Sequence, residues 1–131
     1  MPDDWKPHGY PQLSPYLVTR GAPEVIAFLE AAFDAKVLRR YDRPDGTIMH
    51  VELRIGDSVV MLGEGTDKWP PIEGQVHLYV PDVDEAYRRG LAAGGVSITP
   101  PAEREDDPDR RGGLRDPSGN SWWIATQVRP G

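Results

Sequence analysis

Apolar and polar residues alternate through the middle of the first half of the chain. Within residues 47–55 the apolar residues from Met49 on occupy odd-numbered positions and the polar residues even-numbered ones. Side chains in a strand point alternately to the two faces of a sheet. The apolar positions are Met49, Val51, Leu53 and Ile55, and the polar positions are His50, Glu52 and Arg54. The pattern predicts a strand with one face under a core and one face that presents polar groups.

Helical spacing occurs twice. Residues 24–33 read EVIAFLEAAF and place a broad apolar stripe on one side of a helix, with Pro23 suited to its first turn. Residues 83–93 read VDEAYRRGLAA, with Asp82 as the N-cap, Glu85 in capping-box register and a glycine pair after the last turn. Two helices are therefore predicted, one in each half of the chain.

Runs rich in β-branched and aromatic residues predict the other strands. These strands cover residues 15–19, 36–41, 58–62, 75–80 and 96–99, with two more inside RGGLRDPSGNSWWIAT at 111–126. Residues 100–111 are acidic and proline-rich, and they predict a solvated loop at a place where it could gate a cavity. The resulting element order is βαβββ in each half.

This doubled order is an internal repeat. Gly56 and Gly119 are 63 positions apart and Pro15 and His77 are 62 apart, so the register holds across both halves. Because four strands and one helix cannot bury a sheet alone, we predict one α+β domain of two βαβββ modules. The modules form a curled mixed sheet around a central cavity, with the helices on the outside. Within residues 1–131, the parts are an N-terminal arm (1–14), a first module (15–62), a linker (63–74) and a second module (75–127).

Two adjacent tryptophans follow the turn DPSGN near the C-terminus. On a strand, Trp122 and Trp123 must point to opposite faces, so both cannot serve one core. We predict that Trp122 and Ile124 lie beneath a helix and that Trp123 faces the cavity. The same alternation on the preceding module strand places Val76, Leu78 and Val80 in the core and His77 and Tyr79 in the cavity.

The composition narrows the chemistry. The chain of 131 residues has no cysteine, which excludes thiol nucleophiles and cysteine metal sites and favours a cytoplasmic location. Its formal charge of −6 disfavours nucleic acid as a partner, and no apolar run reaches the length of a membrane span. We therefore expect neither a nucleic-acid nor a membrane partner.

Three segments carry a resemblance to a known superfamily. They are TIMHVELRIGDSVVML at 47–62, VHLYVPDVDEAYRRGLAAGG at 76–95 and GGLRDPSGNSWWIAT at 112–126. With the paired βαβββ order, they make residues 14–126 similar to the glyoxalase/bleomycin-resistance/dioxygenase superfamily, also called the vicinal oxygen chelate fold. The chain looks most similar to the PhnB-like branch of that superfamily.

The resemblance also identifies positions at which relatives bind metals. Metalloenzymes of this superfamily usually place ligands on the first and last strands of each module, pointing into the cavity. Carried over, these positions are Pro15, Val60 or Met61, His77 and Trp123. Only His77 is a competent ligand, whereas a divalent ion held by nitrogen and oxygen donors needs three or four. The resemblance therefore implies a cavity without a metal or other cofactor.

Three hypotheses about function follow. The first is a small-molecule binding protein with an aromatic cavity, including antibiotic resistance or sequestration, and its predicted ligand-binding residues are His50, Glu52, Met61, His77, Tyr79 and Trp123. The second is a metal-dependent lyase, isomerase or dioxygenase in which His77 and a carboxylate such as Glu52 hold the ion in an unusual arrangement. The third is a domain whose cavity is filled by side chains and which serves only in self-association.

Several candidate residues also have plainer interpretations. Trp123 could fill a gap at a module or dimer seam, and the polar face over residues 50–54 could simply be solvated. If that face is enclosed, His50 could act as a general base that Glu52 orients.

A homodimer is also expected. Relatives of this size commonly pair, and Trp5 and Tyr10 of the arm offer apolar surface to a neighbour.

Overall fold

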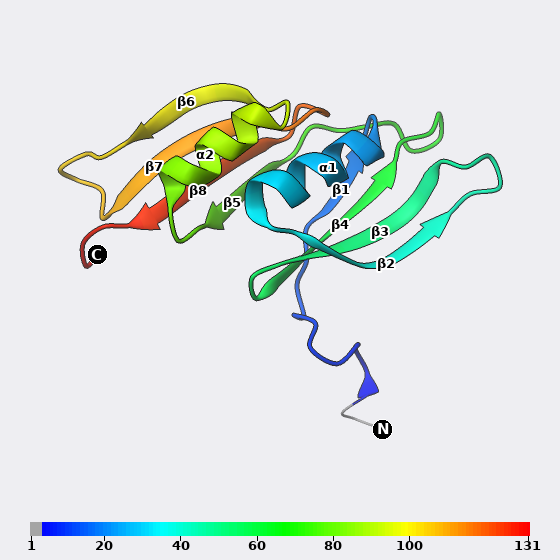
Figure 1. Cartoon of the computed structure of the whole chain (residues 1–131). Coiled ribbons are helices and arrows are strands. Elements are labelled where there is room, and N and C mark those ends of the chain that lie inside the picture. Colours follow the sequence, from blue (N-terminus) through cyan, green and yellow to red (C-terminus); the bar gives the residue numbers. More distant parts are fainter. Residues whose placement is uncertain (1–3) are drawn as a thin grey trace.

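The computed structural model describes residues 4–131 and contains two four-stranded sheets and two helices (Figure 1). The first module consists of β1 (Tyr16–Thr19), α1 (Ala22–Phe33), β2 (Lys36–Asp42), β3 (Ile48–Ile55) and β4 (Ser58–Glu64). The second consists of β5 (Gln75–Tyr79), α2 (Val83–Ala92), β6 (Val96–Ala102), β7 (Asp109–Arg115) and β8 (Ser121–Gln127). The predicted α+β class and the paired βαβββ modules are confirmed.

The two sheets have the same internal arrangement. Their strand orders are β1-β4-β3-β2 and β5-β8-β7-β6, and in each the first strand of the module pairs in parallel with the last. Helices α1 and α2 pack beside each other on one side of the two sheets, so within residues 4–131 the opposite faces carry no helix (Figure 1). The sheets stay separate within one chain, and the shared face is open rather than closed into a cavity.

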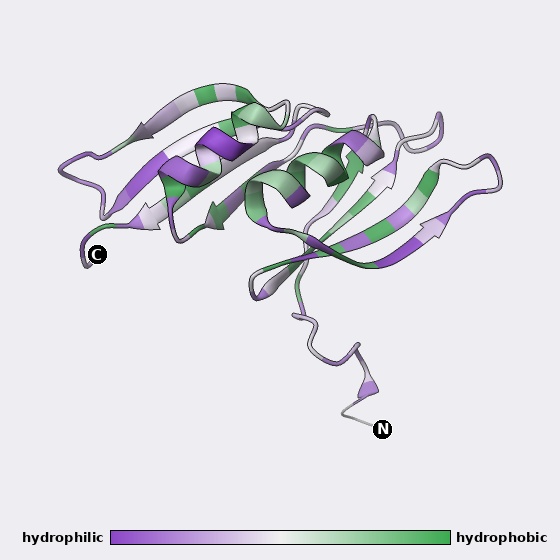
Figure 2. Cartoon of the chain, in the orientation of Figure 1, coloured by the Kyte–Doolittle hydropathy of each residue, from purple (hydrophilic) through white to green (hydrophobic). Residues whose placement is uncertain are grey.

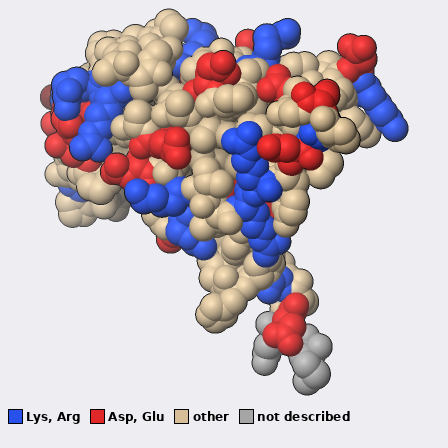
Figure 3. Space-filling model, turned by 45° about the vertical axis from the view of Figure 1, so that its right-hand side comes forward, with Lys and Arg blue, Asp and Glu red and all other residues tan. Residues whose placement is uncertain are grey.

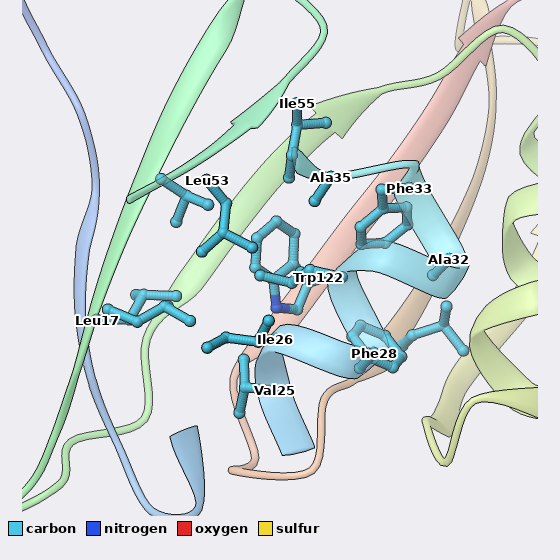
Figure 4. Close-up of a cluster of buried hydrophobic side chains, with 14 of the residues drawn as sticks. Leu17, Val25, Ile26, Phe28, Ala32, Phe33, Ala35, Leu53, Ile55 and Trp122 are labelled. Carbon is cyan, nitrogen blue, oxygen red and sulfur yellow. The ribbon is translucent and has the colours of Figure 1, made fainter. Parts of the chain in front are cut away.

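Helix α1 forms the centre of the core. Figure 2 shows that α1 consists largely of apolar residues, whereas α2 contains several strongly hydrophilic ones. The indole of Trp122 is 1% exposed and lies 5.4 Å from the Phe33 ring, and Figure 4 places it beside Leu53 and Ile26. Ile124 is also buried, so the predicted core positions on β8 are confirmed. Among the described residues, neither helix is long and apolar enough to cross a membrane.

A buried carboxylate fixes the turn before the tryptophan pair. One oxygen of Asp116 accepts hydrogen bonds from the backbone N–H groups of Ser118 and Asn120, at 2.9 and 3.1 Å. The other accepts from Asn120 Nδ2 at 3.0 Å and from Trp122 Nε1 at 2.9 Å. Asp116 is 3% exposed, so it provides both the turn and the acceptor that the buried indole N–H requires.

Each module's last strand also caps that module's helix. Glu64 on β4 accepts from the N–H groups of Gly21 and Ala22, at 2.9 and 2.7 Å, and a carboxylate is favourable at the positive end of a helix. Thr126 on β8 accepts from the N–H of Val83 at 2.9 Å in the same way. This contact therefore repeats between the modules, as their sequence register does.

Strands β6 and β3 each differ from the sequence prediction in one detail. Strand β6 extends through Pro100 and Pro101, which is possible because β6 is the edge strand and needs hydrogen-bond donors on one side only. On β3, the register shifts opposite Tyr41 and Asp42, so Met49 is the extra residue of a β-bulge. The bulge breaks the alternation, and Met49 is 48% exposed instead of lying under the helix.

Candidate functional site

The sheet faces opposite the helices present two side chains from each module, at positions that are equivalent between the modules. Tyr16 on β1 lies in register with Met61 on β4, and His77 on β5 lies in register with Trp123 on β8. Tyr16, not Pro15, is therefore the first-strand counterpart of His77. The alignment of the two halves of the sequence paired Pro15 with His77 instead. Equivalent residues are 61 positions apart on the first strands of the modules but 62 positions apart on the last strands.

A polar cluster around Glu52 occupies the first module. The Tyr10 hydroxyl donates to Glu52 Oε1 at 2.6 Å, and His50 Nε2 lies 2.7 Å from Oε2. The guanidinium of Arg39 lies 3.6 Å from the same carboxylate, which is 6% exposed. The residues predicted as a polar face are therefore not simply solvated, because Glu52 is enclosed and hydrogen-bonded.

The surroundings of Glu52 favour its ionised form. Burial raises the pKa of the Glu52 carboxyl, but the hydrogen bonds from Tyr10 and His50 and the nearby charge of Arg39 outweigh burial, so the pKa lies below its ordinary value. Burial and the hydrogen bond to Glu52 raise the pKa of the Tyr10 phenol. The cluster thus combines a charged acceptor with a neutral donor.

Aromatic rings lie next to this polar cluster. Tyr16 and His50 are stacked with their ring centroids 5.5 Å apart, and the centroids of Tyr41 and His50 are 6.2 Å apart. A cavity of about 400 Å³ is lined by Glu52 and Met61 together with the arm. A second, of about 270 Å³, is lined by Tyr16, the displaced Met49 and Trp69 of the linker. The first module therefore offers both flat apolar surface and hydrogen-bonding groups.

In the second module, Trp123 lies across the sheet. A Cβ built on Gly113 of β7 would lie 2.8 Å from the Trp123 ring, so only glycine lets the indole approach the strand this closely. The indole N–H donates to Gln75 Oε1 at 3.0 Å. Trp123 is partly exposed on the face opposite Trp122, as the alternation predicts.

An ion-paired cluster surrounds the other two predicted residues of this module. Arg111 Nη1 lies 2.8 Å from His77 Nε2, and Arg111 Nη2 lies 2.9 Å from the buried Asp109. The Tyr79 hydroxyl donates to the same Asp109 oxygen at 2.7 Å, which raises the pKa of the phenol. Since a guanidinium only donates, His77 Nε2 must accept, and the ring proton then resides on Nδ1.

The four equivalent side chains do not suit a divalent metal. Tyr16, Met61 and Trp123 supply a phenol, a thioether and an indole, and the Nε2 lone pair of His77 is directed at Arg111. In residues 4–131, no three histidine, aspartate or glutamate side chains come together in a way that could hold an ion. Glu52, the carboxylate named as an example in the metal-dependent hypothesis, lies on a different sheet from His77, and the two residues contact different neighbours.

The six predicted site residues fall into two groups rather than around one cavity. His50, Glu52 and Met61 belong to the first sheet, whereas His77, Tyr79 and Trp123 belong to the second. His77 and Tyr79 line a hollow of about 550 Å³ between β5 and the turn that joins β3 to β4. Sequence reasoning missed Tyr10, Tyr16, Arg39, Asp109 and Arg111.

One sequence signal could have revealed part of the second cluster. Asp107, Asp109 and Arg111 occupy every second position, as residues on one face of a strand do. That stretch was assigned to a loop, whereas β7 begins at Asp109 and places the two later residues on one face.

Comparison with known proteins agrees with this architecture. The uncharacterized protein Mb0911c of Mycobacterium bovis is 38% identical over 130 residues, covering 91% of this chain and 85% of its own. Among solved structures, TioX from Micromonospora sp. ML1 superposes with a TM-score of 0.76 at 24% identity, covering 90% of this chain and 99% of its own.

Two further structures share the fold at lower identity. TnmS3, an antibiotic binding protein from Streptomyces sp. CB03234, has a TM-score of 0.68 at 16% identity, with 88% of this chain and 93% of its own covered. The PhnB protein of Bacillus cereus has a TM-score of 0.66 at 18% identity, with 88% and 99% covered. The family model of the Glyoxalase/Bleomycin resistance protein/Dioxygenase superfamily matches residues 12–124, and the chain belongs to that superfamily.

Proposed function

We propose that this protein binds a small planar or aromatic molecule on the open sheet faces, without a resident metal or other cofactor. The observation that carries the proposal is the identity of the four equivalent side chains, Tyr16, Met61, His77 and Trp123. Three of them have planar rings, and the fourth is a polarisable thioether that packs well on rings. Each sheet adds a polar group that can orient a ligand on it, Glu52 on the first sheet and Tyr79 on the second.

Antibiotics are the first class of ligand to examine. TnmS3 has the same fold and is itself an antibiotic binding protein. At 16% identity only the shared fold supports the choice of antibiotics as test ligands. Binding without turnover would sequester such a compound in the cytoplasm. Figure 3 shows acidic and basic side chains interspersed over the visible surface, which fits a small-molecule partner better than nucleic acid.

The ligand can be sought through tryptophan fluorescence. We expect a planar antibiotic to quench the emission of the wild-type protein and to bind Trp123→Phe about tenfold more weakly, because stacking area on the indole is lost. Trp5→Phe is the matched control, since Trp5 lies in the arm and is 64% exposed. A panel of planar antibiotics that leaves the emission of the wild type unchanged would refute the proposal.

We also propose that the protein is a homodimer. The sheet faces without helices are left open by the single chain, and they expose apolar groups such as Tyr16 and Tyr79, at 51% and 61%. Covering these faces by a second copy would enclose the ligand. Sedimentation velocity at micromolar concentration should show one dimeric species, and a stable monomer at that concentration would contradict the proposal.

A further inference from the structure

The N-terminal arm places a phenol directly on the Glu52 cluster. The Tyr10 hydroxyl donates to Glu52 Oε1 at 2.6 Å, and the guanidinium groups of Arg39 and Arg54 lie 5.2 and 5.9 Å from the centre of the Tyr10 ring. Arg54 also donates to the backbone carbonyl of Gly9 at 3.1 Å. The site therefore binds one aromatic ring: a carboxylate accepts the hydrogen bond from its hydroxyl, and two guanidinium groups lie near the ring.

The rest of the arm has few connections to the body of the protein. Figure 1 shows the arm projecting from the start of β1. Among residues 4–14, the backbone hydrogen bond from Tyr10 to Pro7 closes a local turn, and Lys6 donates to the Tyr10 carbonyl within the arm. The hydrogen bonds that join these residues to the sheet come from the side chains of Tyr10 and Arg54. An arm held mainly around one side chain can be displaced without unfolding a strand.

We propose that Tyr10 occupies a subsite for the phenol group of a ligand, so that hydroxylated aromatic molecules are the ligand class and must displace the arm to bind. The inference rests on the proposed binding function and specifies its chemistry. A phenol supplies the hydroxyl donor that ionised Glu52 requires and a ring face for Arg39. An aromatic carboxylate would place its charge against the Glu52 carboxylate, so this subsite selects phenols over aromatic acids.

Occupation by the arm also lowers the apparent affinity of the site. When an intramolecular group competes for a site, the observed affinity equals the intrinsic affinity multiplied by the fraction of molecules in which the site is free. Removing the Tyr10 side chain abolishes this competition and leaves Glu52, Arg39 and Arg54 in place. Alanine keeps the Cβ, so the vacated volume is that of the phenol ring, and the methyl group of 4-methylphenol takes the place of that Cβ when the arm is displaced.

The test uses 4-methylphenol as the probe and the imidazole NMR signals of His50 and His77 as the readout. We expect 4-methylphenol to bind Tyr10→Ala at least about tenfold more tightly than the wild type, since a hydrogen bond to a charged group and its ring contacts no longer compete. The signal of His50, which contacts Glu52, should shift while that of His77 stays unchanged. Toluene, which lacks the hydroxyl, should bind much more weakly to the same variant.

Controls make the outcome decisive. Trp5→Ala removes another arm aromatic and should keep the wild-type affinity for 4-methylphenol. If Tyr10→Ala does not fold, Tyr10→Phe removes only the hydroxyl and should still bind the probe more tightly than the wild type. Equal affinity in variant and wild type, or equal binding of toluene, would overturn the inference. Because the readout is at His50, this result is distinguishable from a failure of planar antibiotics to quench tryptophan emission.

Discussion

Replacing Trp122 with alanine should lower the free energy of unfolding by about 3–5 kcal/mol, the range measured when a large aromatic side chain is removed from a core. The indole is 1% exposed, packs on Phe33 and donates to Asp116, so its removal leaves a large cavity and an acceptor with one donor fewer. A loss of that size is a large part of the stability of an ordinary domain.

The neighbouring tryptophan provides the matched comparison. Trp123→Ala should cost about 1 kcal/mol, because its side chain is partly exposed on the open sheet face. Urea unfolding followed by circular dichroism at one protein concentration measures both values. Similar losses for the two variants would show that the two indoles do not face opposite sides of the sheet as described.

Asp116→Ala should lower the free energy of unfolding by at least about 3 kcal/mol, because buried donors left without an acceptor cost about 1–3 kcal/mol each. The lost acceptor serves the Asn120 backbone N–H, the Asn120 side-chain amide and the Trp122 indole. Asn120 is fully buried and Trp122 nearly so, which prevents water from replacing the carboxylate.

A second aspartate in a turn separates burial from turn chemistry. Asp45 accepts from the backbone N–H and the hydroxyl of Thr47, at 2.9 and 2.7 Å, but these bonds are exposed to solvent. Asp45→Ala should therefore be much less destabilising than Asp116→Ala in the same urea experiment. If Asp116→Ala were no more destabilising than Asp45→Ala, the buried acceptor would not be what fixes the turn.

Most of the fold could be predicted because its signals are local. Side-chain parity on β8 separated Trp122 from Trp123, and helical spacing gave α1, whose predicted stripe is the centre of the core. The Asp82 side chain accepts from the N–H of Glu85 at 3.1 Å, as its position predicts. The Glu85 carboxylate instead pairs with Arg88 and Arg89, so the capping box is only half formed.

Features that depend on the partner strand could not be predicted. Met49 has the right parity for the core, but the bulge is defined by its pairing with β2, which the local pattern does not contain. Tyr16 was missed because one residue fewer separates the modules on their first strands than on their last. The closure of the two sheets around one cavity was inferred from the repeat, whereas the single chain leaves them open.

Long-range contacts explain what was missed at the candidate site. Glu52 was expected on the functional face, but its donor Tyr10 is 42 residues away in an arm with no periodicity. Its ion-pair partner Arg39 comes from the neighbouring strand and is identified only by the strand register. Polar alternation therefore predicts that a side chain faces the site, whereas its partners depend on tertiary structure.

The central claim, ligand binding on an aromatic surface without a metal, is tested most directly by titrating the best planar ligand in excess chelator. Protein purified without a histidine tag is first analysed for bound metals. We expect no stoichiometric metal, and the same fluorescence quenching with and without the chelator. Ligand binding that requires one equivalent of zinc, nickel, manganese or iron, and that His77→Ala abolishes, would contradict the account.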